Sequence, residues 1–173
     1  MQKDSLGVSD EIGLAVERRP AVIQSFVPVM GDVFLELLDE NGELKDYQHV
    51  KNLVVDAGEN HIADQLSSSP GGNAMSHMAI GTGSTAAAFG DTGLGAETDR
   101  NALTSRTDSV NVVTYVGTWA AGDGTNAALR EAGIFNAAST GTMLARAVYS
   151  NIDKQAGDTL TITWTVTIGT AGA

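Results

Sequence analysis

Cysteine is absent from the 173 residues of this chain. Without thiols the protein can form neither disulfides nor thiolate metal sites. Its stability must therefore come from the packing of apolar side chains or from association between subunits. Histidine is also scarce, because His49, His61 and His77 are the only three and none has the spacing of a zinc site. We expect each of them to be a surface or half-buried residue.

Basic residues are few, at 10 lysines and arginines against 21 acidic residues, which gives a net charge of −11 and a pI of about 4.4. Nucleic-acid-binding proteins place basic stripes against phosphate, so this balance argues against a nucleic-acid partner. No run of eighteen apolar residues occurs, and the first residues lack a basic region followed by an apolar stretch. The sequence predicts a soluble protein without a membrane partner, made in the cytoplasm.

Charged residues of both signs make up only 18% of the chain and aromatic residues 5%, while glycine reaches 20. Glycine together with serine, threonine and alanine favours β-sheets with long loops over a helical bundle. The length fits one domain with an appendage, and it is sufficient for a substantial core.

Residues 159–168 alternate without interruption between threonine and a large apolar residue. Side chains in a strand have a period of two, so this segment predicts a strand with one apolar and one hydroxyl-bearing face. A long uncharged strand is a hazard at a free edge, so we expect it to be central in an antiparallel sheet or covered by another subunit. The predicted core residues are Leu160, Ile162, Trp164, Val166 and Ile168.

A hairpin is predicted for residues 33–38 and 43–50, because Asn41-Gly42 between two extended segments is a strong turn signal. A helix is predicted from Asp56 or Gly58 through Leu66, with Ile62 and Leu66 forming its buried stripe.

Further strands are expected at regular spacing, and residues 86–101 are expected to form a long loop. This spacing predicts a mainly β protein, an antiparallel β-sandwich or jelly-roll-like domain with one short helix. The expected strands are 77–80, 103–107, 110–119 (with Val110, Val112, Tyr115 and Trp119 as its apolar positions), 128–135 and 143–149.

Residues 1–31 differ from the rest and are predicted to form an extended N-terminal arm, with residues 32–173 as the sandwich domain. Prolines at positions 20 and 28 favour an extended path over a helix. Between them lies an apolar cluster that is too short to form its own core. The arm is either a disordered leader or a segment that packs on another subunit; the candidate partner-binding residues are Val22, Ile23, Phe26 and Val27.

Catalytic and ligand-binding motifs are missing. Gly81-Thr82-Gly83 lacks the lysine and the third glycine of phosphate-binding loops, so we interpret it as a tight turn with positive φ. Asp91, Glu97 and Asp99 share one loop, but the ligand order of an EF-hand is absent and such loops usually face water. The sequence therefore predicts no metal or cofactor.

Enzymatic activity is not expected either. Acidic residues are plentiful enough to supply a carboxylate pair for glycoside hydrolysis, but the aromatic residues that line sugar clefts are scarce. The serine-nucleophile motif Gly-x-Ser-x-Gly does not occur. Arg130-Glu131 is expected either to pair within the protein or across a subunit boundary, or to be an exposed surface pair.

An ordered set of segments is similar to a family of tailed-bacteriophage virion proteins, which include tail-fibre, head-decoration and minor structural proteins. The resemblance covers about residues 33 to 168 and implies a β-sandwich structural subunit without catalytic residues. It does not extend to the arm. The segments are KNLVVDAG (51–58), HMAIGTGSTA (77–86), GDTGLG (90–95), ALREAGIFN (128–136), MLARA (143–147) and DTLTITW (158–164).

The leading hypothesis is a capsid decoration, or cement, protein that sits on the phage head as an oligomer, with a trimer favoured. It would bind the major capsid protein or another virion protein and use its arm to lock neighbouring subunits. One alternative is a tail-fibre, neck or baseplate protein that attaches through the arm. Another is a carbohydrate-binding module that uses Tyr115, Trp119 or Trp164 as a stacking platform, although the alternation of its strand places Trp164 in the core.

Overall fold

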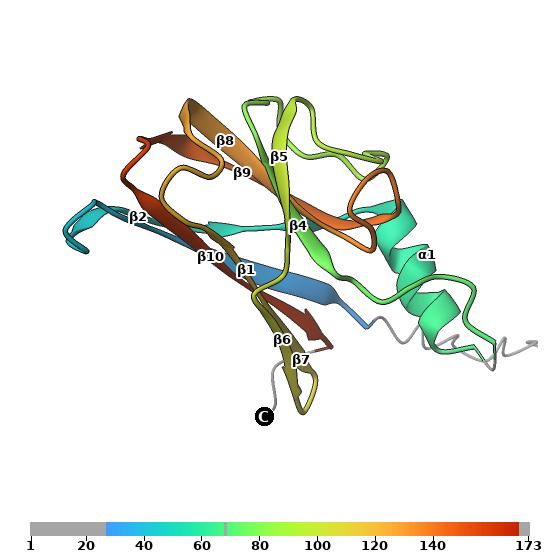
Figure 1. The fold of residues 1–173 in the computed structure, drawn as a ribbon. Coiled ribbons are helices and arrows are strands. Elements are labelled where there is room, and N and C mark those ends of the chain that lie inside the picture. Colours follow the sequence, from blue (N-terminus) through green and yellow to red (C-terminus); the bar gives the residue numbers. More distant parts are fainter. Residues whose placement is uncertain (1–26, 68, 170–173) are drawn as a thin grey trace, which may run out of the picture.

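Two five-stranded antiparallel sheets pack face to face in the computed structural model, which describes residues 27–67 and 69–169 (Figure 1). The first sheet has the order β2-β1-β10-β7-β6, and the second has the order β3-β9-β8-β4-β5. The predicted mainly β, antiparallel sandwich is confirmed. The strands are β1 Val29–Leu38, β2 Leu44–Lys51, β3 Leu53–Val54, β4 His77–Gly81, β5 Glu97–Ala102, β6 Ser105–Ser109, β7 Val112–Trp119, β8 Asn126–Phe135, β9 Met143–Lys154 and β10 Thr159–Ile168.

Strand β10 lies in the middle of the first sheet, between β1 and β7, as its alternation predicts. Trp164 is opposite Val33 on one side and Tyr115 on the other. The four apolar residues from Leu160 to Val166 are buried, and the threonines between them are half-buried on the outer face. Ile168 was also predicted to be in the core, and this is wrong. It is 39% exposed, because it is the last residue of the strand and lies at the open end of the sandwich.

The predicted hairpin is formed by β1 and β2. Gly42 has a φ of +82°, and the Asp39 carboxylate accepts hydrogen bonds from the backbone N–H groups of Asn41 and Glu43 at 2.8 and 2.9 Å. Such local bonds fix a turn without help from the rest of the fold. Strand β1 begins at Val29, so residues 29–31, which the sequence analysis assigned to the arm, belong to the sheet.

The predicted helix is present as α1, Asp56–Gln65, but its buried stripe differs from the prediction. Gly58 and His61 are buried, Ile62 is half-buried, and Leu66 lies beyond the last turn and is 84% exposed. The cause is the close approach of α1 to β9, where a Cβ atom on Gly58 would lie 2.0 Å from the carbonyl oxygen of Leu144. The helix packs through its backbone, a contact that apolar periodicity cannot reveal.

Two further expectations for residues 86–119 are wrong. The expected loop contains strand β5, which pairs with β4 at the edge of the second sheet. Its residues are polar because an edge strand can face water. Val110 was assigned to a strand, but it forms the turn between β6 and β7, with a φ of +56° and a fully exposed side chain. The apolar side of β7 consequently follows Val113, Tyr115 and Trp119.

The alternation of β10 predicts unequal costs for two truncations on the same strand. Trp164 is fully buried, so Trp164→Ala should lower the free energy of unfolding by about 3–5 kcal/mol. Ile168→Ala is the matched control and should cost less, because its side chain is partly exposed already. Urea denaturation followed by tryptophan fluorescence and circular dichroism measures both. Equal losses for the two variants would contradict the assignment of the faces.

Candidate docking surfaces

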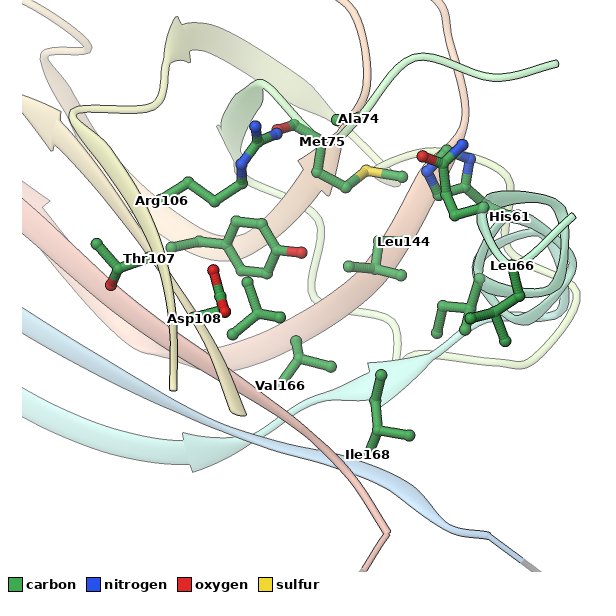
Figure 2. A pocket seen from close by; sticks show the side chains of 14 residues that line it. His61, Leu66, Ala74, Met75, Arg106, Thr107, Asp108, Leu144, Val166 and Ile168 are labelled. Carbon is green, nitrogen blue, oxygen red and sulfur yellow. The ribbon is translucent and has the colours of Figure 1, made fainter. Parts of the chain in front are cut away.

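An apolar groove with a volume of about 400 Å³ opens at the end of the sandwich where β1 begins and β10 ends. Figure 2 shows α1 with His61 and Leu66 on one side, the β6 residues Arg106 to Asp108 on the other, and Leu144, Val166 and Ile168 between them. This volume falls in the range of protein binding pockets. The apolar lining consists of Ile62, Leu66, Ala74, Met75, Val113, Tyr115, Leu144, Val166 and Ile168.

The groove continues the interior of the sandwich to the surface. Val113 and Val166 are opposite each other on β7 and β10, and both face the space between the sheets. The neighbouring edge strand β6 does not add apolar cover, because the residues that it places on this side are Arg106 and Asp108, opposite Tyr115 and Val113. The apolar floor of the groove therefore stays partly uncovered.

Two of the polar side chains at the rim form hydrogen bonds within the protein. Arg106 donates a hydrogen bond to the Met75 carbonyl at 2.5 Å, and Gln65 donates to the Gly72 carbonyl at 2.8 Å. Burial raises the pKa of Tyr115, and the nearby Arg106 only partly offsets this, so the phenol stays protonated at neutral pH. The mainly apolar lining of the groove therefore suits apolar side chains as ligands.

The second candidate surface is the outer face of β10 and β7. Thr161, Thr163 and Thr165 of β10 are opposite Thr118, Val116 and Thr114 of β7, and all are half-buried. This face carries no charged residue along either strand. In a chain with a net charge of −11, a neutral face of this extent is a candidate for protein contact.

Of the four arm residues that the sequence singled out, the structure describes one. Val22, Ile23 and Phe26 lie outside the described residues. Val27 is described and is 58% exposed. The adjoining Pro28 carbonyl accepts a hydrogen bond from the Gly169 N–H at 2.7 Å, which places the start of the described chain next to the groove residue Ile168.

A buried ion pair organises the outer face of the second sheet. The Glu131 carboxylate is fully buried and lies 2.7 Å from a guanidinium nitrogen of Arg146. It also accepts backbone hydrogen bonds from Gly83, Gly95 and Ala96 at 2.7–2.9 Å. These donors come from both ends of residues 82–96, so the pair holds that loop against the sheet.

The guanidinium of Arg146 completes the attachment of the 82–96 loop. It binds Asp91 at 2.8 Å and the Thr85 carbonyl at 3.0 Å. Burial raises the pKa of Glu131, but the three backbone donors and Arg146 outweigh burial and hold that pKa below its usual value. Glu131 is therefore ionised at neutral pH, and its partners are fully committed to structure.

This cluster decides one question that the sequence left open and corrects one prediction. Arg130 and Glu131 do not pair with each other. Glu131 pairs with Arg146, whereas Arg130 is exposed where the β8–β9 register shifts and bonds Asn151 at 3.1 Å. The positive φ predicted for the Gly81 to Gly83 turn is wrong. Glycine is needed there for space, since a Cβ atom on Gly83 would lie 2.3 Å from the Glu131 carboxylate.

Two of the three acidic residues considered for a calcium site have separate cationic partners. Asp91 binds Arg146, and Glu97 binds Arg100 at 2.6 Å. Asp99 is partly buried, and its pKa is raised by burial and by the nearby Asp123 carboxylate. Among the described residues, no group of three or more His, Asp or Glu side chains is arranged to hold a metal ion.

The histidines behave differently from one another. His49 is exposed, stacks on Phe34 and contacts Asp32 at 2.6 Å. His77 is half-buried and bonds Ser76 at 2.8 Å. The expectation of a surface or half-buried position is wrong for His61, which is 8% exposed because α1 lies so close to β9.

The aromatic residues considered for sugar stacking cannot form an exposed platform. Trp119 and Trp164 are fully buried between the sheets, and Tyr115 is 7% exposed. Their strands point all three side chains into the core.

No family model, curated protein or solved structure matches this chain. None of the helices in the described part of the chain is long and apolar enough to cross a membrane. Function must therefore be argued from the two surfaces themselves.

Removing the cation of the buried pair should be costly. Arg146→Met leaves the Glu131 carboxylate buried without its charged partner, so the free energy of unfolding should fall by about 3–5 kcal/mol. Arg130→Met is the matched control, because Arg130 is the exposed neighbour of Glu131 on β8 and should change stability by less than about 1 kcal/mol. Chemical denaturation at pH 7 compares the two. A similar loss of unfolding free energy in the two variants would show that Arg146 is not needed to stabilise the buried Glu131 carboxylate.

The low pKa of Glu131 predicts a dependence of stability on pH. Since the pKa is lower in the folded protein than its usual 4.5, the ionised carboxylate stabilises the fold above pH 4.5. This contribution is lost as the pH falls from 4.5 through the folded pKa. Glu131→Gln should therefore be less stable than the wild type at pH 7, and the difference should narrow below pH 4.5. Denaturation curves recorded from pH 7 to pH 3 test this; a difference that is independent of pH would refute it.

Proposed function

We propose that this chain is a non-enzymatic structural subunit of a tailed-bacteriophage virion, and more specifically a capsid decoration protein. It binds the major capsid protein or another virion protein and associates with further copies of itself. The resemblance of residues 33 to 168 to virion proteins suggests the setting, and the surfaces described above suggest how the subunit is used.

The observation that carries this proposal is the neutral outer face of β10 and β7. A second copy of the chain is equally acidic, so contact through charged surfaces would bring like charges together. The threonine and valine side chains of this face avoid that repulsion, and the strand pairing of β10 with β7 holds them side by side. The remaining acidic surface faces solvent and keeps the particles apart.

The opposite sheet is not available in the same way. Its outer face is covered by the 82–96 loop, which the buried pair fixes, and by α1. Leu94 of the loop and Ala57 of α1 pack against Phe135 and Met143 there. This cover favours the first sheet for assembly through a sheet face.

The number of copies per particle tests the position in the virion. Quantitative mass spectrometry of purified particles, calibrated against the major capsid protein, should find hundreds of copies of a decoration protein. A dozen copies or fewer would favour a tail, neck or baseplate subunit over the capsid surface. Absence from purified particles would refute the virion role.

Self-association through the neutral face is tested by introducing a charge there. The purified protein should sediment at micromolar concentration as an oligomer of the 17.9 kDa chain. Thr163→Glu should lower its average mass, because an unpaired charge in a protein contact must be desolvated. Ala127→Glu, at an exposed position of β8 in the other sheet, is the control and should leave the mass unchanged. A Thr163→Glu protein with the wild-type mass would exclude this face from the contact.

A further inference from the structure

The apolar groove at the end of the sandwich has no described segment filling it. Leu66 at one side is 84% exposed and Ile168 at another is 39% exposed, while Val113 and Val166 form the floor. Contiguous exposed apolar surface on a soluble protein usually marks a contact with another chain. The groove therefore calls for an apolar occupant (Figure 2).

The arm supplies a segment of matching chemistry. From Pro20 to Pro28 the sequence is PAVIQSFVP, which contains Val22, Ile23 and Phe26 and no charged residue. An aromatic side chain flanked by aliphatic ones is a suitable anchor for an apolar pocket. Exposed in a separate subunit, the same segment would be a liability.

The arm also leaves the sandwich at the mouth of the groove. Val29, the first residue of β1, is opposite Ile168, and the Pro28 carbonyl accepts a hydrogen bond from Gly169. Residues 20–26 can span at most about 25 Å when extended. The segment therefore reaches a groove only on its own subunit or on one directly beside it.

Backbone chemistry favours the neighbouring subunit. Pro28 fixes its own φ, and the residue before a proline is restricted to an extended conformation. This restriction favours an extended backbone at Val27, whose side chain is 58% exposed. A path that continues outward from the start of β1 favours a groove on a neighbouring copy over the groove of the same chain.

We infer that residues 22–26 of one copy dock in the apolar groove of a second copy. This inference rests on the self-association in the proposed function and names the contact that locks neighbouring subunits. Exchange of a terminal segment between identical subunits is a low-cost route to an oligomer, because every subunit places its arm on a neighbour and also binds the arm of a neighbour. It covers the apolar arm and the apolar groove at the same time.

The cysteine-free sequence allows a direct test by disulfide formation. Gln24→Cys marks the arm without removing an apolar side chain, and Leu66→Cys and Asp108→Cys mark two sides of the groove. The control is Leu44→Cys, which is 60% exposed and lies at the opposite end of the β1–β2 hairpin. A disulfide requires Cα atoms about 4–7 Å apart, so only docked pairs form one efficiently.

The arm variant is mixed with each groove variant and oxidised mildly. The expected result is a disulfide-linked pair of chains with at least one groove variant, in a yield several-fold above that with Leu44→Cys. A yield no higher than the control would refute docking in the groove. Because purified protein is used without virions, that failure would leave the virion role to the copy-number measurement.

A variant that carries both Gln24→Cys and the groove substitution with the higher yield distinguishes docking in a second copy from docking in the same chain. Docking in a second copy predicts linked dimers whose yield falls when unsubstituted protein is added in excess. A disulfide within one chain that forms at nanomolar concentration and resists this excess would overturn the inference in favour of the chain's own arm. As an independent check, Phe26→Asp should weaken self-association by at least about tenfold without changing the thermal melting of a diluted sample.

Discussion

The buried pair of Glu131 and Arg146 is the interaction on which the shape of this protein depends. A carboxylate and a guanidinium removed from water are costly unless their remaining hydrogen-bonding positions are satisfied. Here three backbone N–H groups of the 82–96 loop and the Asp91 carboxylate satisfy them. The pair thereby turns a long glycine-rich segment into a fixed cover over the second sheet.

This cover makes the two sheets unequal. The outer face of the second sheet is closed by the loop and by α1, whose Gly58 allows the helix backbone to lie directly on β9. The outer face of the first sheet is left open and carries the neutral residues of β10 and β7. The proposed assembly surface is thus defined as much by what the buried pair covers on one side as by what it leaves free on the other.

The same asymmetry places the groove and the arm together. Helix α1 and the β6–β7 hairpin stand on either side of the end of β10, and the apolar floor between them reaches the surface (Figure 2). Strand β1 begins at this end, so the arm and its proposed receptor site are neighbours by construction. In the proposed assembly, each subunit therefore has an arm and an apolar groove at one end and a neutral sheet face along one side.

Local patterns in the sequence determined the strands that obey them. The alternation of residues 159–168 placed β10 at the centre of a sheet, and Asn41-Gly42 located the first hairpin, because both signals depend only on neighbouring residues. The polar edge strand β5 and the turn at Val110 carried no such signal, and they were assigned wrongly. Of the two candidate surfaces, the threonine face of β10 could be predicted from the same alternation.

Only the tertiary structure decided the contacts between residues far apart in the chain. Arg130-Glu131 was visible as a charged pair in the sequence, but the true partner of Glu131 is fifteen residues away on the next strand. Gly83 was interpreted as part of a tight turn and Gly58 as a possible start of the helix. In the fold, the missing side chain of Gly83 leaves space for a carboxylate and that of Gly58 for a backbone carbonyl. The groove likewise has walls from α1, β6 and β10, so it exists only when the fold brings those elements to one end. The periodicity of apolar residues predicts which side of a helix or strand is buried, but not how far that element lies from its neighbours. The ion pair of Glu131 and Arg146, the contact of α1 with β9 and the groove all depend on those distances.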